Sequence, residues 1–183
     1  MSESQSKPYT LDMDRARRCG FPEVVYGDGK TVDTLREIFE RLLASGVNVL
    51  ATRIDQEKAP PLLASFPTAA YNEAARTFRI DSADGESQAK HGRVAIVTAG
   101  TSDLPVAEEA RETLDWMNVC TTMVQDVGVA GPHRLPERIA EFQDCDAIVV
   151  VAGMEGALPS VVGGYVDCPV IAVPTRVGYG ANL

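Results

Sequence analysis

Four apolar runs in the second half of the chain each end at a turn that contains glycine. They lie at residues 94–98, 122–126, 147–151 and 169–173. Their valine, isoleucine and alanine residues mostly follow one another without the polar alternation of a half-exposed strand, which predicts strands covered on both faces. Helical patterns separate the runs, so the sheet is expected to be parallel, with crossover helices. The carboxyl ends of parallel strands meet along one edge, where open α/β sheets bind their ligands.

Acidic residues outnumber basic ones in this chain. The 183 residues include 26 Asp and Glu against 17 Lys and Arg, a formal charge of -9. Such a surface repels nucleic acid phosphates and anionic lipids, so neither a nucleic acid nor a membrane is an expected partner. No apolar stretch reaches the roughly 18 residues of a membrane-spanning helix, and the polar first residues lack the apolar core of a signal peptide. We therefore expect a cytoplasmic protein.

The sequence divides into two α/β parts joined by a polar segment. Residues 1–81 are expected to form a small N-terminal lobe, with strands at 23–26 and 48–54, a helix from Thr31 to Gly46 and a short strand pair between 68 and 80. Residues 82–92 hold no apolar side chain larger than alanine, which predicts a linker. Residues 93–183 form the second domain in this interpretation.

The four cysteines lie far apart in the sequence and form no CxxC pair. Cys120, Cys145 and Cys168 fall in or beside predicted core strands, while Cys19 lies near the N-terminus. This distribution predicts buried thiols rather than a metal or redox motif.

The turn after the first of the four runs has the composition both of a helix start and of an anion site. Gly100 and Thr101 lead into Ser102 and Asp103, and Pro105 fits the first turn of the following helix. A capped helix is one interpretation, and a phosphate held by Ser102 and the free N–H groups is the other. Asp103 would then need a hydroxyl partner or a metal ion, which makes it a possible metal ligand. A phosphoribosyl group with Mg²⁺ would supply the phosphate for Ser102 and both a hydroxyl and a metal ion for Asp103.

Glu155 is the acidic residue best placed for catalysis. It follows the third apolar run, after Gly153 and Met154 and before Gly156, where small residues let the backbone approach a ligand. With partial burial, its carboxylate can act as a general base or bind a metal ion. A solvated loop glutamate is the alternative. His133 is expected to lie exposed at a helix start and is assigned no catalytic role.

A basic segment lies near the N-terminus of this acidic chain. Arg15, Arg17, Arg18 and Lys30 concentrate positive charge there. Such a cluster suits the second phosphate of a dinucleotide, and a solvated basic face is the competing explanation.

Residues 93–183 resemble the catalytic subunit of phosphoribosylaminoimidazole carboxylase. The similarity rests on Ser102-Asp103-Leu-Pro105, Ala152-Gly153 followed by Leu158-Pro159, and Pro169-Val-Ile-Ala-Val-Pro174. It implies a flavodoxin-like parallel-sheet domain with three layers. That carboxylase carries an active-site histidine just before Leu-Pro, where this chain has Ala157. The same chemistry on aminoimidazole ribonucleotide is therefore disfavoured.

Nearly the whole chain is similar to the LarB family of nickel-pincer cofactor biosynthesis proteins, in which a small N-terminal lobe precedes a carboxylase-like domain. The motifs that carry this similarity are Arg15-Ala-Arg-Arg18 with Gly20-Phe-Pro-Glu-Val24, Thr98-Ala-Gly-Thr101 with Pro105-Val-Ala-Glu-Glu109, Asp126-Val-Gly-Val-Ala-Gly131 with His133-Arg-Leu135, Ala152-Gly-Met-Glu-Gly-Ala157 and Val177-Gly-Tyr-Gly180.

The resemblance implies a pyridinium-3,5-biscarboxylic acid mononucleotide synthase. This family carboxylates the pyridinium ring of nicotinic acid adenine dinucleotide with CO₂, supplied as bicarbonate, and hydrolyses the phosphoanhydride to release AMP. A cysteine thiolate adds to the ring, the resulting enamine attacks CO₂, and a base removes the ring proton. Glu155 matches the family's glutamate and is assigned as that base. Gly178 is assigned to substrate binding, and Mg²⁺ is expected at the phosphoanhydride.

The family's cysteine nucleophile belongs to a segment after the Gly-Tyr-Gly turn, and the sequence stops at Leu183 without it. No apolar helical pattern follows the last strand to cover the sheet. We therefore expect a truncated domain that lacks its final elements and binds the dinucleotide without carboxylating it. Two alternatives stay open: a carboxylase or mutase of an aminoimidazole ribonucleotide, and a non-catalytic nucleotide-binding subunit. A homo-oligomer is expected in each case.

Overall fold

The computed structural model describes residues 9–82, 89–154 and 156–176. These residues form two compact units, one of residues 9–71 and 78–82 and the other of residues 72–77 and 89–176. Two of the predicted site residues, Glu155 and Gly178, lie outside the described residues. So does most of the predicted linker at 82–92.

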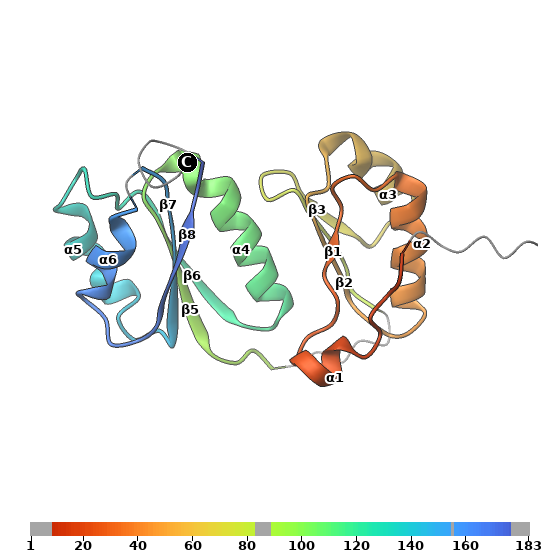
Figure 1. The fold of residues 1–183 in the computed structure, drawn as a ribbon, viewed down its shortest axis with the longest axis horizontal. Coiled ribbons are helices and arrows are strands. Elements are labelled where there is room, and N and C mark those ends of the chain that lie inside the picture. The colour runs from red at the N-terminus through yellow and green to blue at the C-terminus, as the bar shows by residue number, and fades with distance from the viewer. Residues whose placement is uncertain (1–8, 83–88, 155, 177–183) are drawn as a thin grey trace, which may run out of the picture. The chain divides into compact units, whose positions relative to one another are not determined.

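The N-terminal elements form a mixed four-stranded sheet in the order β1-β2-β4-β3 (Figure 1). β1 pairs with β2 in parallel, and β2 pairs with β4 in antiparallel orientation. The elements are α1 (Arg15–Cys19), β1 (Val25–Tyr26), α2 (Val32–Leu43), β2 (Val49–Thr52), η1 (Gln56–Lys58), α3 (Ala59–Ser65), β3 (Ala70–Asn72) and β4 (Thr77–Ile80).

The helix α2 shows how local sequence and packing agree in this unit. Thr31 caps the helix, since its Oγ1 accepts a hydrogen bond from the Thr34 amide at 3.2 Å. One apolar stripe of the helix is fully buried, with Phe39 stacked on Phe78 of β4 at 5.6 Å between ring centroids. A single hydrophobic core therefore holds this unit together.

The second unit contains a fully parallel sheet in the order β6-β5-β7-β8. This order places the first strand of the domain between the second and the third, as in the flavodoxin-like arrangement. The elements are β5 (Arg93–Thr98), η2 (Thr101–Asp103), α4 (Leu104–Trp116), β6 (Cys120–Val124), α5 (Arg134–Arg138), η3 (Ile139–Glu141), β7 (Ala147–Ala152), α6 (Leu158–Gly163) and β8 (Val170–Pro174). The four predicted strands are confirmed, with β6 beginning and ending two residues earlier than expected.

Helices cover the two faces of this sheet. α4 lies on one face, and α5 and α6 lie on the other (Figure 1). Successive residues of β5 alternate between the two cores, with Ala95 and Val97 facing α5 and α6 and with Ile96 facing α4. The domain is thus a three-layer α/β structure, as predicted. No helix in the described ranges is long and apolar enough to cross a membrane.

The edge strand β8 departs from the expectation that every strand is covered on both faces. Val170 packs into the core beside α6, whereas Ile171 on the opposite face is 52% exposed. Within the described residues, the α4 face is covered by one helix, which packs mainly on β5 and β6 and reaches β8 only at Val173. The sequence pattern of a central strand therefore occurs here in an edge strand.

Two of the four cysteines also differ from the expectation of buried thiols. Cys120 is exposed because it begins the edge strand β6, and Cys19 is exposed at the end of α1. Cys145 is buried, and this burial raises the pKa of its thiol above the ordinary value. Cys168 is half-buried and packs against the same core as Cys145.

Candidate functional site

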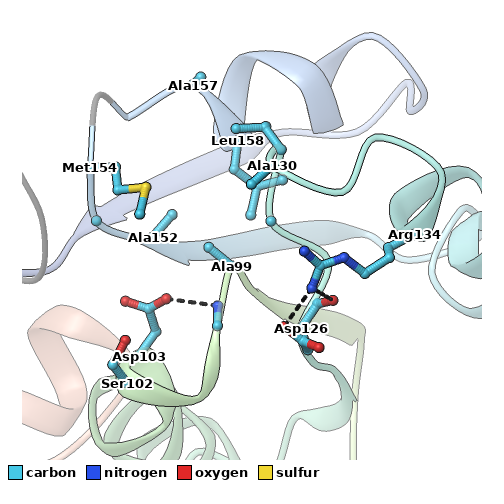
Figure 2. A pocket seen from close by; sticks show the side chains of 14 residues that line it. Ala99, Ser102, Asp103, Asp126, Ala130, Arg134, Ala152, Met154, Ala157 and Leu158 are labelled. Carbon is cyan, nitrogen blue, oxygen red and sulfur yellow. Dashed lines mark hydrogen bonds and ion pairs between the residues drawn. The ribbon is translucent and has the colours of Figure 1, made fainter.

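A pocket of about 230 Å³ opens at the carboxyl ends of β5, β6 and β7. Three loops that are far apart in the sequence supply its walls, as the topology of a parallel sheet requires. Figure 2 shows Ser102 and Asp103 on one side, Asp126 and Arg134 on another, and Met154 above them. The residues that line it are Ala99, Gly100, Ser102, Asp103, Asp126, Gly128, Val129, Ala130, Arg134, Ala152, Gly153, Met154, Ala157 and Leu158.

Five of the predicted site residues come together in this pocket, namely Gly100, Ser102, Asp103, Gly153 and Met154. Two others, Thr101 and Gly156, belong to the same loops but are not among the lining residues. The structure thus confirms that the turns after the first and third apolar runs converge on one pocket. The binding role of each residue stays a prediction.

Asp103 is buried, with 3% of its surface exposed, and both of its carboxylate oxygens have partners. Oδ2 accepts a hydrogen bond from the Gly100 amide at 3.0 Å, and Oδ1 accepts one from the Thr175 hydroxyl at 2.7 Å. Gly100 is the N-cap residue of η2, which leads directly into α4, so the contact of Asp103 with the Gly100 amide is that of a capped helix start. The capped-helix interpretation is therefore confirmed for this carboxylate. Its role in the structure is to join the loop after β5 to the end of β8.

This environment also bears on the predicted metal. The two oxygens of Asp103 already accept short hydrogen bonds inside the protein. Among the described residues, no group of three or more His, Cys, Asp or Glu side chains is arranged to hold a metal ion. The described residues therefore form no cluster that holds Mg²⁺ by protein ligands alone. Mg²⁺ is usually bound through one or two carboxylates together with substrate phosphates, so the role of Asp103 as a metal ligand stays a prediction.

A cation faces the pocket from the start of α5. The Nη1 atom of Arg134 donates a hydrogen bond of 2.7 Å to Asp126 Oδ1 and one of 3.1 Å to the Asp126 carbonyl. In the described part of the chain, both hydrogen bonds of Arg134 use Nη1, which leaves Nη2 and Nε to bind a ligand anion. The guanidinium is therefore held in place while part of its donor fork stays available.

Asp126 adopts a backbone conformation that lets its carboxylate hold Arg134. Its φ angle is +60°, in the left-handed region that aspartate tolerates better than most residues. Its amide donates a hydrogen bond of 3.3 Å to the hydroxyl of Thr98, the last residue of β5. The turn thus directs the carboxylate toward Arg134.

The loops after β5 and β6 touch each other beneath the pocket. The Gly128 amide donates to the Ala99 carbonyl at 2.9 Å, and a Cβ at position 128 would lie only 2.8 Å from that oxygen. Glycine is therefore required at this position because the two backbones approach so closely. This contact fixes the distance between the two loops.

The remaining wall is apolar. Ala130, Ala152, Ala157 and Leu158 line it, and the side chain of Met154 projects over the opening, 46% exposed (Figure 2). Alkyl groups and a thioether suit contact with a flat ring. The pocket therefore combines an apolar wall with the Arg134–Asp126 ion pair at one side.

The predicted basic residues lie in the first unit and have partners there. Arg18 forms an ion pair with Asp12, the Arg15 guanidinium lies 5.1 Å from the centre of the Phe21 ring, and Lys30 Nζ donates to the Tyr26 carbonyl at 2.6 Å. Their part in ligand binding stays a prediction. His133 is exposed immediately before α5, as expected.

Sequence reasoning missed Asp126 and Arg134 as site residues. The rule that assigned the turns after β5 and β7 applies equally to the turn after β6, where Asp126 is the first charged residue beyond the strand. Arg134 lies eight residues further along, at the first position of α5. A systematic search for charges after every strand would have found the aspartate, and the arginine would have followed as its partner.

Comparison with known proteins agrees with this architecture. Residues 5–82 match the family model described as LarB/PurE-like N-terminal domain, and residues 93–181 match the model described as AIR carboxylase. The chain is 45% identical over 180 residues to the uncharacterized protein MJ0165 of Methanocaldococcus jannaschii, covering 94% of this chain and 70% of that protein. It is 32% identical over 90 residues to the N5-carboxyaminoimidazole ribonucleotide mutase of Thermotoga maritima, covering 46% of this chain and 50% of that enzyme.

The two family matches follow one another along the chain in the order that the sequence motifs indicated. The second match coincides with the parallel sheet that carries the pocket, and it indicates carboxylase- or mutase-type chemistry. The chain belongs to the family of LarB-like proteins, with a LarB/PurE-like N-terminal domain followed by an AIR carboxylase domain.

Proposed function

We propose that the pocket binds the nicotinic acid ribotide half of nicotinic acid adenine dinucleotide and serves the carboxylation of its pyridinium ring by CO₂, followed by hydrolysis of the phosphoanhydride with release of AMP. The observation that carries this proposal is the guanidinium of Arg134, held by Asp126 beside an apolar wall at the carboxyl edge of the sheet. The N-terminal LarB/PurE-like match distinguishes this chain from a carboxylase that consists of the second domain alone.

The apolar wall and the free donors of Arg134 correspond to two different parts of the ligand in this arrangement. The ring packs on the wall formed by Ala152, Ala157 and Leu158, and its phosphate accepts hydrogen bonds from the Nη2 and Nε atoms of Arg134. The Ser102 hydroxyl lines the same pocket and is exposed, so it can donate a further hydrogen bond to the ribotide. These contacts orient the ring, and none of them is a covalent bond to it.

The proposed reaction forms a carbon–carbon bond and then restores the aromatic ring. The ring carbon that attacks CO₂ keeps its proton until a base removes it, and we assign this step to Glu155, which follows the pocket residue Met154 in the sequence. The ring must first accept a nucleophile to become electron-rich, and this nucleophile leaves again after the proton is removed, which restores the aromatic pyridinium. We assign the nucleophile to no described residue. Mg²⁺ accompanies the phosphoanhydride in this proposal, and no protein ligand is assigned to it.

A second candidate is the carboxylation or rearrangement of an aminoimidazole ribonucleotide. The similarity to the Thermotoga maritima mutase favours it, because the matched region contains the pocket. The pocket residue Ala157 disfavours it, since a methyl group can neither donate nor accept a proton where the resemblance calls for a histidine. Both ligands carry a ribose phosphate, so Arg134 alone does not separate them.

Calorimetric titration tests the proposal. The chain is titrated with nicotinic acid adenine dinucleotide, nicotinic acid mononucleotide and aminoimidazole ribonucleotide, and radiolabelled bicarbonate with Mg²⁺ then tests for carboxylated product and AMP. We expect binding of both pyridinium nucleotides and a clear preference over the imidazole nucleotide. A preference for the imidazole nucleotide would favour the second candidate, and binding of neither class would refute both.

The variant Arg134→Met tests the anion contact. Loss of two charge-assisted hydrogen bonds is expected to weaken binding of nicotinic acid mononucleotide by about 10- to 100-fold. The Arg138→Met variant, on the same helix, is the matched control, since Arg138 is half-buried, pairs with Glu141 and does not line the pocket. Equal affinity in the two variants would show that Arg134 does not bind the phosphate.

A further inference from the structure

A second pocket of about 250 Å³ lies directly beside the first and belongs to the same domain. The two share Gly128, Val129 and Leu158, so they are separated only by a wall of backbone and small apolar side chains. Val161 and Tyr165, from α6 and the turn after it, complete the rim of the second pocket. Both are unusually exposed for apolar or aromatic side chains, at 41% and 46%.

The size of the two pockets limits what each can hold. Pockets that enclose a whole drug-sized ligand usually have volumes of roughly 300–1,000 Å³. Each of the two pockets falls below this range, whereas together they fall within it. A dinucleotide, which carries two ring systems joined by phosphates, therefore needs both pockets rather than one.

The two pockets differ in the charge and polarity of their lining, and the two ring systems of the ligand differ in charge. The first pocket contains the polar groups of Ser102, Asp126 and Arg134. None of the described residues that line the second pocket is charged. A pyridinium ring carries a positive charge and an adenine ring is neutral, so the apolar second pocket favours the adenine.

Arg134 lies at the junction of the pockets. A Cβ added at Gly131, which lines the second pocket, would lie 2.1 Å from Arg134 Nε, so the guanidinium packs directly over this glycine. The same guanidinium lines the first pocket. Phosphates bound to Arg134 would therefore have one pocket on each side, which is the arrangement of a dinucleotide.

We propose that the second pocket is the adenine subsite, in which the base of the departing AMP lies on the apolar floor and stacks on the Tyr165 ring. This inference rests on the proposed function, because it assigns the second half of the same substrate. The same inference places the release of AMP at the second pocket. The phosphoanhydride lies between the pockets, and water cleaves it into AMP, whose base stays in the second pocket, and the mononucleotide, whose ring stays in the first.

Two variants at the rim test the subsite. Tyr165→Ala removes the ring and is expected to weaken binding of nicotinic acid adenine dinucleotide roughly 10-fold, the usual range for one stacked base. Tyr165→Phe keeps the ring and is expected to bind as the unchanged protein does. Val161→Trp fills the pocket, and its control is Ile171→Trp, an exposed aliphatic residue on the opposite face of the sheet. Nicotinic acid mononucleotide is titrated alongside in every case.

The outcomes separate the subsite from the function. Weaker dinucleotide binding in Tyr165→Ala and Val161→Trp, with mononucleotide binding unchanged, supports the adenine subsite. Equal dinucleotide affinity in all four variants overturns the subsite while the proposed function stands. Failure of the unchanged protein to bind either nucleotide overturns both. Light scattering measures the oligomeric state of each variant. A change in Val161→Trp alone would show that another copy of the chain covers this pocket, and this result would also overturn the proposal.

Discussion

The contact between Asp103 and Thr175 joins two residues that lie 72 positions apart in the sequence. Both are buried, and the hydroxyl donates to the carboxylate at 2.7 Å. The Thr175 amide also donates to the Ala152 carbonyl at 3.0 Å, so this residue ties together the ends of β5, β7 and β8. The buried charge of Asp103 depends on its hydrogen bonds, since an unpaired carboxylate is costly in the protein interior.

Replacement of Thr175 by Val should therefore destabilise the protein by about 2–3 kcal/mol, the cost of removing a hydrogen bond from a buried charged group. Thr175→Ser is the matched control because it keeps the hydroxyl. Urea denaturation followed by circular dichroism measures the free energy of unfolding of both variants. If the serine variant loses as much stability as the valine variant, the methyl group rather than the hydrogen bond is what matters at this position.

At the same scale, the sequence predicted the place of Asp103 but not its role. Its position after β5 followed from the topology of a parallel sheet. Its partner Thr175 did not, because a hydrogen bond between residues far apart in the sequence depends on the final approach of two strand ends. For Asp126 the position itself was missed, although it too follows a strand of the parallel sheet and so lies at the carboxyl edge.

At the scale of elements, the pocket depends on how closely the loops after β5 and β6 approach. Gly128 is the residue that permits this approach, because its amide bonds to the Ala99 carbonyl and leaves no room for a Cβ. Gly100, in the partner loop, has open space where its own Cβ would lie, and its φ of -153° is accessible to any residue. Gly100 and Gly128 line the same pocket, yet only Gly100 has room for a side chain.

Substitution of Gly128 by Ala is expected to destabilise the domain by roughly 1–3 kcal/mol, since the added methyl group must push two backbones apart. Gly100→Ala should leave stability unchanged within about 0.5 kcal/mol. Thermal unfolding of both variants measures the difference, and titration with nicotinic acid mononucleotide shows whether the pocket is distorted. Equal melting temperatures would contradict the close approach of the two loops.

The elements themselves were the most predictable part of the molecule. Continuous Val/Ile/Ala runs identified β5, β7 and β8, and the helical spacing of Leu35, Ile38, Phe39 and Leu42 identified α2. The start of β6 was misplaced by two residues because one cysteine followed by two threonines gives only a weak apolar signal. The exposure of Ile171 was missed for a related reason, since a run of apolar residues does not reveal whether its strand is central or at the edge.

At the scale of the whole molecule, the two units have separate hydrophobic cores, and the described pocket belongs entirely to the second. The family matches divide the chain in a similar way, with one model for each half. A ligand stabilises only the cooperative unit whose native state it binds. The response of each unit to the dinucleotide therefore reports where the ligand makes its contacts.

Hydrogen exchange with and without nicotinic acid adenine dinucleotide tests this separation. At about 100 times the dissociation constant, the ligand adds about 2.7 kcal/mol to the stability of the unit that binds it, which slows exchange through unfolding of that unit about 100-fold. We expect this protection in peptides from 99–104 and 126–134 and little change in α2. Added protection at residues 15–30 would show that Arg15, Arg18 and Lys30 bind the ligand, as the sequence suggested. Protection confined to the first unit would contradict the pocket as the binding site, because a ligand held by Arg134 must protect the segment around the start of α5.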